Sequence, residues 1–202
     1  MGSSAAEYCL TRHEMQLSGN EIERIVYGYV VPFFVLFGTI GNVVSLMVLL
    51  SPPMRSRSRN LCYLAIVDIL FLLLMFPHSL ANYEIFAYNF YFRQLYLSVK
   101  VHLLALSNWI SASAIWLVLL ICMERLIGVR YPFHVKKYST TRDKRCSLLT
   151  LAFVLTATGL LTIYTHINYN TLMRTFCNGT QPHAFFIAID SQTSAFLFHF
   201  TI

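Results

Sequence analysis

Long apolar runs alternate with short polar segments along the chain. Four runs reach the roughly 20 residues that a helix needs to cross a bilayer, namely Val26–Leu50, Leu61–Ala81, Val101–Met123 and Cys146–Ile167. A fifth apolar run, Ala184–Ile202, extends to the last residue. Because lipid offers the backbone no hydrogen-bond partners, each run is expected to be a helix. The pattern predicts an all-α, multi-span transmembrane bundle with four complete spans and part of a fifth, preceded by a polar tail over residues 1–25.

The composition agrees with a membrane protein. Apolar residues make up 56% of the 202 residues and charged residues 12%, against about 45–50% and about 25% in soluble domains. The formal charge of +6 does not indicate nucleic acid, because the basic residues gather in two short loops. Membrane lipid is therefore the expected environment. The polar segment Met1–Asn20 lacks the apolar core of a signal peptide, so the first span is expected to direct insertion.

The positions of Lys and Arg predict the orientation, because these residues favour cytoplasmic loops. Ten of the 15 basic residues follow the first or the third run: Arg55, Arg57, Arg59, Arg125, Arg130, Lys136, Lys137, Arg142, Lys144 and Arg145. The tail is therefore expected outside the cell. An N-x-[ST] sequon at Asn178 would then be external and is a candidate glycosylation site, and the aromatic segment Tyr83–Tyr96 would lie at the outer interface.

Two polar side chains lie inside predicted spans, where a charge costs roughly 2.5–3.5 kcal/mol. Asp68 lies about 10 Å along its helix from the inner end of the second span, and Asn42 lies about 12 Å from the inner end of the first. The two are thus expected at one depth on antiparallel helices, where they can meet. Gly41 is expected to let the two backbones approach. The alternative is a lone Asp68 that is protonated or snorkels.

The third span carries a polar face. Ser107, Asn108 and Ser111 are expected to line an outer ligand pocket, with Leu104 and with Pro77 of the second span as further candidates. The alternative is that the small and hydroxyl side chains join neighbouring helices. Pro77 is also expected to kink the second span.

Two charges end the third span at its cytoplasmic boundary. Glu124 can pair with Arg125, which lowers the cost of placing both at the membrane edge. Such a pair would be a latch that opens when the helices part. The alternative is an ordinary snorkelling Arg125.

Two other classes of function fit less well. A transporter or channel piece could use Asn42 and Asp68 as a polar path, but no paired broken helices or half-repeats are present. An enzyme needs clustered catalytic groups. The span-end histidines His102, His134, His166 and His199 are far apart, with no metal-ligand spacing such as H-E-x-x-H. The sequence therefore predicts no enzyme activity, no metal centre and no cofactor.

Three motifs occur in order and at matching membrane depths. They are "GNVVSL" around Asn42, "NLCYLAIVD" ending at Asp68, and "ERLIGVRYPF" from Glu124 to Phe133. In this arrangement the chain resembles the rhodopsin-like (class A) G-protein-coupled receptors from Val26 to about Ile202. The resemblance implies a seven-helix receptor domain over residues 26–202 in the plasma membrane. It also implies two partners, an extracellular ligand and a heterotrimeric G protein.

The resemblance implies roles for particular residues. Asn42 and Asp68 would form a buried polar cluster that holds water or an allosteric sodium ion. Glu124 and Arg125 would form the ionic lock, and Arg125 would meet the G protein after release. Phe133, which follows Pro132, would be the apolar side chain of the second inner loop that docks on the G protein.

The chain departs from that family's pattern at several positions. Lys100 stands where the family has the Cys that bonds to the second outer loop, so Cys177 lacks its usual partner. Cys9 is the only other clearly external thiol, and a Cys9–Cys177 bridge is one candidate that the sequence leaves open. Leu126 replaces the family's usual Tyr, and the fourth span lacks the usual Trp. These departures imply a divergent branch.

The resemblance also narrows the ligand class. Ser107 stands where amine receptors carry the Asp that pairs with the ligand, which disfavours an amine. Pro77 and the aromatic outer segment resemble neuropeptide receptors of the FMRFamide type, which implies an extracellular peptide ligand. No sixth- or seventh-span motif is present, so the chain is expected to be a fragment or a truncated form. The alternative to a signalling receptor is a truncated form that pairs with a full-length receptor and retains it.

Overall fold

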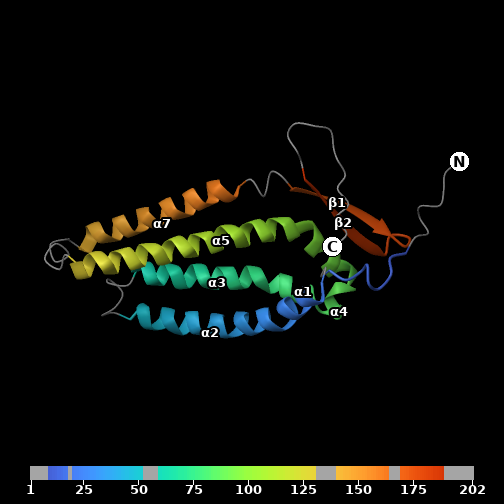
Figure 1. Ribbon diagram of the computed structural model, residues 1–202, viewed down its shortest axis with the longest axis horizontal. Helices are drawn as coiled ribbons and strands as arrows, with labels where there is room; N and C mark the ends of the chain where they lie inside the picture. The colour runs from blue at the N-terminus through green and yellow to red at the C-terminus, as the bar shows by residue number, and fades with distance from the viewer. Residues whose placement is uncertain (1–8, 18–19, 52–58, 131–139, 164–168, 189–202) are drawn as a thin grey trace. The chain divides into compact units, whose positions relative to one another are not determined.

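The computed structural model describes residues 9–17, 20–51, 59–130, 140–163 and 169–188 (Figure 1). The chain divides into two compact units. One, which we call the hairpin unit, comprises residues 1–35, 74–106 and 163–202. The other, which we call the four-helix unit, comprises residues 36–73 and 107–162. The first two of the three sequence motifs and the charged start of the third fall in the four-helix unit.

Four helical stretches among the described residues are long and apolar enough to cross a membrane: Glu21–Leu49, Arg59–Leu80, Phe90–Arg130 and Arg145–Thr162. They coincide with the four predicted runs, which confirms the mostly helical, multi-span fold. The bounds differ in detail. Helix α3 (Arg59–Leu80) contains Pro77 in its last turn, and α5 (Phe90–Arg130) begins well before Val101 and continues past Met123. Helix α7 spans Thr140–Thr162 and ends before Ile167.

The first span is interrupted by a proline. It consists of α1 (Glu21–Ile25), a single π-helical turn η1 (Val26–Val30) and α2 (Val31–Leu49). Pro32 has no N–H to donate to the carbonyl four residues earlier, which belongs to Gly28. The hydroxyl of Tyr83, just before α4 (Glu84–Ala87), donates to that carbonyl at 2.6 Å. The wider turn and this tyrosine together accommodate Pro32 within a continuous span.

The hairpin unit contains a β-hairpin, which follows α7 in the sequence. Strands β1 (Tyr169–Phe176) and β2 (Gln181–Ala188) pair antiparallel, with Tyr169 opposite Ala188 and Phe176 opposite Gln181. The turn between them has three residues with positive φ, Cys177 (52°), Asn178 (54°) and Gly179 (85°). Asn and Gly tolerate this left-handed conformation better than other residues, and they allow the tight reversal.

The hairpin corrects one prediction. A fifth helical span was expected from Ala184, but Ala184–Ala188 belong to strand β2. A short apolar stretch such as Ala184–Ala188 fits a strand as well as a helix. The pairing with Tyr169–Phe176 decides between the two. The rest of the expected span, residues 189–202, lies outside the described residues.

Each unit has its own small core. In the hairpin unit Ala81, Tyr96, Leu97 and Ala184 are buried together, and Leu17, Phe92 and Met173 pack against them. In the four-helix unit the buried cluster is Val67, Leu117 and Val154, which joins α3, α5 and α7 (Figure 1). Helix α2 has no buried residue, and Phe34, Leu36 and Met47 are all more than half exposed. Such apolar exteriors suit helices surrounded by lipid.

Candidate functional site

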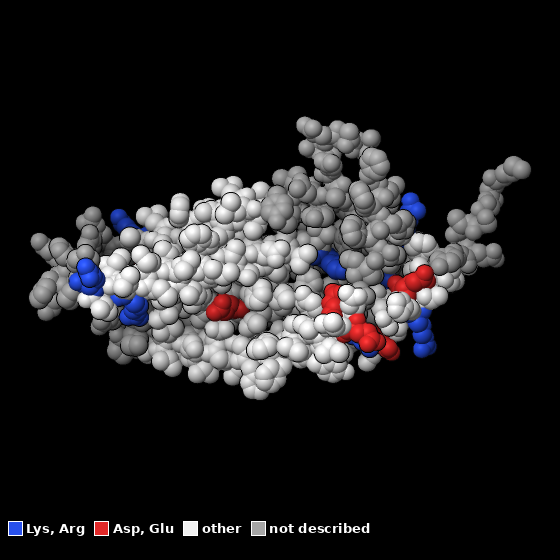
Figure 2. All heavy atoms as spheres, viewed as in Figure 1, with Lys and Arg blue, Asp and Glu red and all other residues white. Residues whose placement is uncertain are grey.

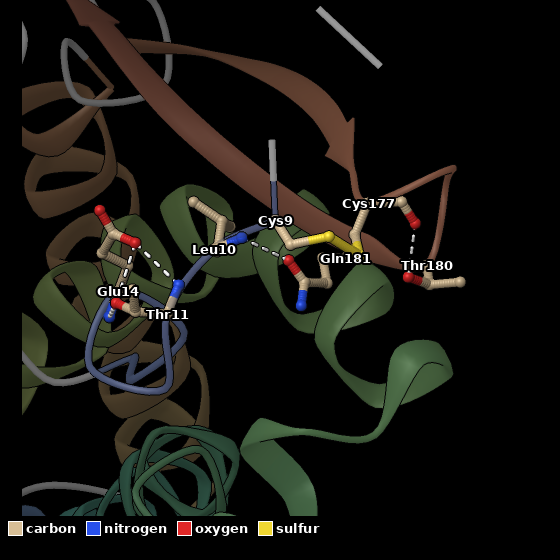
Figure 3. The surroundings of a disulfide bond; sticks show 7 residues. All are labelled: Cys9, Leu10, Thr11, Glu14, Cys177, Thr180 and Gln181. Carbon is tan, nitrogen blue, oxygen red and sulfur yellow. Dashed lines mark hydrogen bonds between the residues drawn. A yellow bond between two sulfur atoms is a disulfide. The ribbon is translucent and has the colours of Figure 1, made fainter. Parts of the chain in front are cut away.

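The amino-terminal segment is covalently tied to the hairpin. Cys9 and Cys177 form a disulfide with their Cα atoms 4.4 Å apart, which resolves the pairing that the sequence left open (Figure 3). The Leu10 N–H also donates to the side-chain oxygen of Gln181 at 2.7 Å. Glu14 folds back on the same segment and accepts hydrogen bonds from the N–H and hydroxyl of Thr11 at 2.8 and 2.9 Å. The disulfide thus joins the amino-terminal segment to the hairpin across a sequence separation of 168 residues.

Arg93 joins four segments of the hairpin unit, and it was not singled out in the sequence analysis. Its side chain is 1% exposed. The guanidinium donates to the carbonyl oxygens of Met15 and Pro182, to that of Ala87 at 3.3 Å, and to Nδ1 of His183 at 3.4 Å. One feature of the sequence could have identified Arg93. It is a cation inside the aromatic segment Tyr83–Tyr96, and a buried cation needs hydrogen-bond acceptors.

A second polar cluster of the hairpin unit joins α3 to α5. His78 Nδ1 and the Tyr96 hydroxyl lie 2.9 Å apart, and their rings meet edge to face. The side-chain amide of Asn82 donates to the His78 carbonyl at 2.7 Å, which caps the end of α3. His78 Nε2 and Asn82 Oδ1 are buried without a protein partner among the described residues. Each of these two buried polar atoms retains an unused hydrogen-bonding capacity.

The predicted ligand-pocket residues differ in their surroundings. On α5, Leu104 and Asn108 are exposed, Ser111 is half-buried and Ser107 is buried. The Ser107 hydroxyl has no hydrogen-bond partner among the described residues. Pro77 is half-buried near the end of α3. The role of this set as a ligand pocket stays a prediction.

Asn42 and Asp68 line one cleft of the four-helix unit. The cleft has a volume of about 430 Å³ and lies between α2 and α3, with Ser45 contributing a third polar side chain and Leu64 an apolar wall. Both residues therefore line the same cleft, while their direct contact and the sodium ion remain predictions. Figure 2 shows an isolated group of acidic atoms on the otherwise uncharged middle of the face in view.

The close approach of α2 to α3 occurs one turn from the expected place. A Cβ atom at Gly41 would meet nothing within 4 Å, whereas one at Gly38 would lie 2.8 Å from a methyl group of Leu72. The reason is that Gly41 is on an exposed side of α2, and Gly38 is on the side that packs. The residue that lets the helices approach is therefore Gly38.

The charged end of the third span has a polar network that the sequence did not predict. The side-chain amide of Asn60 on α3 donates to Glu124 on α5, and its oxygen accepts a hydrogen bond from the Ser147 hydroxyl on α7. Three helices are thus joined through one side chain. Arg125 is exposed at this end. The predicted docking residues Pro132 and Phe133 lie outside the described residues.

Helices α5 and α7 are joined nearer their middles by polar side chains. The Trp109 indole N–H donates to the Leu155 carbonyl at 2.9 Å, and the ring lies against Gly159. The Ser113 and Thr158 hydroxyls are 2.8 Å apart and fully buried. Ser113 and Thr158 thus join the two helices, although neither residue was singled out in the sequence analysis.

Asn178 is placed where a glycan could attach. It is exposed at the turn of the hairpin, beside the disulfide. In the described part of the chain, no group of three or more His, Cys, Asp and Glu side chains is arranged to hold a metal ion.

The chain matches a family of known receptors. Residues 29–199 match the model of the serpentine-type seven-transmembrane G-protein-coupled chemoreceptor Srw family. The chain belongs to this family. Its members are receptors rather than enzymes, in agreement with the prediction from the scattered histidines.

Two curated relatives come from Caenorhabditis elegans. One, "Putative G-protein coupled receptor F59B2.13", is 40% identical over 190 residues, which cover 94% of this chain and 44% of the relative. The other, "Probable G-protein coupled receptor B0563.6", is 29% identical over 144 residues, which cover 67% of this chain and 32% of the relative. The Srw chain thus spans less than half the length of either relative. No solved structure matches it.

Proposed function

We propose that this Srw chain forms part of a plasma-membrane receptor that binds an extracellular ligand and activates a heterotrimeric G protein. Family membership over residues 29–199 is the observation that carries the proposal. The disulfide supports an extracellular hairpin and amino terminus, because disulfides persist in oxidising surroundings. Arg125 is exposed and follows Glu124, which accepts a hydrogen bond from Asn60, and this exposed cation supports a role for the end of α5 in G-protein docking.

The ligand is proposed to be a peptide. The resemblance to neuropeptide receptors of the FMRFamide type supports this, as does Ser107 in place of an amine-binding Asp. The braced hairpin adds a broad outer surface, which suits a peptide better than a buried pocket does. A small chemical attractant is the second candidate, because the family is described as chemoreceptors.

The latch proposed for the inner end involves Asn60 as well as Glu124 and Arg125. Asn60 bonds to α5 and α7 at once, so a movement that separates these helices must break at least one of its contacts. Release would leave Arg125 available to the G protein. Asn42 and Asp68 are proposed to hold a sodium ion in the cleft at rest, since amide and carboxylate oxygens suit hard cations.

A chimaera tests the receptor proposal. The Srw chain would be joined to the carboxyl-terminal part of the 40% identical relative and expressed with a G-protein activation sensor. Peptide and small-molecule libraries would then be applied separately. Activation by a peptide would support a peptide ligand. Loss of that activation in Arg125→Ala, with activation retained in the exposed-surface variant Arg24→Ala, would support coupling to the G protein through Arg125. Surface expression with no response to either library, together with an unaltered basal signal in Arg125→Ala, counts against coupling.

The alternative is that this chain retains a full-length receptor by pairing with it. Co-expression of the chain with the 40% identical relative measures this directly. The alternative predicts a fall in the relative's surface level in proportion to the chain expressed. The signalling proposal predicts an unchanged surface level.

A further inference from the structure

Arg93 and His183 form a contact that depends on the charge of the histidine. A guanidinium can only donate hydrogen bonds, so the Nδ1 atom that Arg93 meets at 3.4 Å must be an acceptor. The His183 ring is therefore neutral in this arrangement, with its proton on Nε2. If Nδ1 took up a proton, two N–H groups and two positive charges would face each other.

The same guanidinium holds the amino-terminal segment. Its Nη1 atom donates to the Met15 carbonyl, and its Nε atom donates to Pro182, the residue before His183. Arg93 is thus a non-covalent attachment between α5, strand β2 and the segment of residues 9–17, which the hydrogen bond from Leu10 to Gln181 also ties to β2. The Cys9–Cys177 disulfide is a second, covalent attachment of that segment to the hairpin. We call these two attachments the clasp.

We infer that the clasp is a sensor of extracellular acid, in which protonation of His183 expels Arg93 and frees the segment of residues 9–17 from α5, while the disulfide keeps it tethered to the hairpin. The step is reversible and breaks no covalent bond. It adds a proton-sensing function to the receptor, and it does not depend on which ligand or G protein the receptor uses.

The charges around His183 favour the neutral ring at rest. Burial lowers the pKa of the imidazole from its ordinary value, and the positive charges of Arg93 and Lys100 on α5 lower it further, whereas Glu14 of the amino-terminal segment opposes them. On the hairpin, Arg174 is the strand partner of His183, and Phe176 and Phe185 flank the ring edge to face. Glu14 thus favours the protonated imidazole, whereas the cations and the apolar surroundings favour the neutral one.

The direction of the pH effect follows from this lowered pKa. The clasped state binds fewer protons at His183 than the released state, so acid favours release. Release should begin as the pH falls below about 6.5, the ordinary pKa of histidine, and should be complete below the pKa of the clasped state. Each unit between the two pKa values corresponds to about a tenfold change in the equilibrium.

Hydrogen exchange of the purified Srw chain in nanodiscs tests the inference. Protection of peptides covering residues 9–17 and 181–188 would be compared at about pH 7.5 and about pH 5, after correction for the intrinsic pH dependence of exchange. We expect at least a tenfold loss of protection at the lower pH. Peptides from the middle of α5 should keep theirs, which shows that the chain remains folded.

Two histidine variants isolate the responsible group. His183→Gln keeps an acceptor for Arg93 and cannot take up a proton in this range, so its protection should be the same at both pH values. His13→Gln removes an exposed histidine from the same segment and should respond as the wild type does. Arg93→Gln should lose protection at both pH values. Unchanged protection of the wild type on acidification, or an acid response that survives in His183→Gln, would overturn the inference.

Discussion

A Cβ atom at Gly159 on α7 would lie 3.2 Å from the indole nitrogen of Trp109 on α5. The Trp109 ring therefore occupies the space that any larger side chain would need. Its N–H uses that position to reach the Leu155 carbonyl. The pair fixes the distance between the two helices at this level.

Gly159→Val should displace Trp109 and break its hydrogen bond to Leu155. We expect a loss of about 1–3 kcal/mol in the free energy of unfolding, as is typical of overpacking. Denaturation of the chain in detergent and the emission maximum of tryptophan measure the two effects. Gly128→Val on α5 is the matched control, because a Cβ there meets nothing within 4 Å. Equal losses in both variants would show that only helix propensity matters.

Asn60→Asp should weaken the junction of α3, α5 and α7. The new carboxylate would face Glu124, the acceptor of the present hydrogen bond, and two adjacent carboxylates repel each other. We expect a loss of about 1–3 kcal/mol at neutral pH. The loss should diminish in acid, because protonating one carboxylate restores a donor. Gln94→Glu, at an exposed site on α5, should be nearly neutral. A pH-independent loss in Asn60→Asp would argue against the contact.

The Ser113–Thr158 pair should show a favourable coupling energy. Each hydroxyl has one proton and also lies near a carbonyl of its own helix, Trp109 at 2.9 Å from Ser113 and Val154 at 2.7 Å from Thr158. One hydroxyl therefore donates to the other and the other donates to its own carbonyl, so removing one leaves the other partly satisfied. A double-mutant cycle of Ser113→Ala and Thr158→Ala should give about 0.6 kcal/mol, as for other hydrogen bonds between membrane helices. Thr158→Ser keeps the hydroxyl and should retain most of the coupling. A coupling of zero would mean that the contact adds nothing to helix association.

Cys9→Ser and Cys177→Ser should each cost about 2–4 kcal/mol in the free energy of unfolding, and the double variant should cost no more than either alone. Each single variant should also gain one thiol that reacts with maleimide without reduction. Cys122→Ser, which removes an exposed free thiol, should lose one reactive group and little stability. Additive losses from Cys9→Ser and Cys177→Ser would show that the two residues are not bonded.

Asn178→Gln should abolish an N-linked glycan on the chain expressed in animal cells. The side chain is exposed at the hairpin turn, which leaves it accessible to the glycosylation machinery. A glycosidase should increase the gel mobility of the wild type and leave Asn178→Gln unchanged. A surface-expressed wild type whose mobility the enzyme does not alter would remove this support for an external hairpin.

Hydrophobic run length predicted the four spans because lipid leaves the backbone little choice but helix. Depth along two such helices also sufficed to place Asn42 and Asp68 at the same cleft. Contacts that depend on how each helix is rotated about its axis were not predictable. Examples are the packing of Gly38 against Leu72 and the hydrogen bonds of Asn60. The β-hairpin was missed because an apolar run beside a disulfide can be a strand when a partner segment pairs with it. Arg93 was missed because its acceptors are backbone carbonyls of Met15, Ala87 and Pro182, which leave no trace in a sequence.

Orientation in the membrane is the claim on which the proposals for ligand, clasp and latch depend. The direct measurement is antibody access to epitope tags placed before Met1 and, in a second version, between Val135 and Lys136. On intact cells the first tag should bind antibody and the second should bind only after permeabilisation. Antibody bound to the second tag on intact cells, with the first tag inaccessible, would contradict the account.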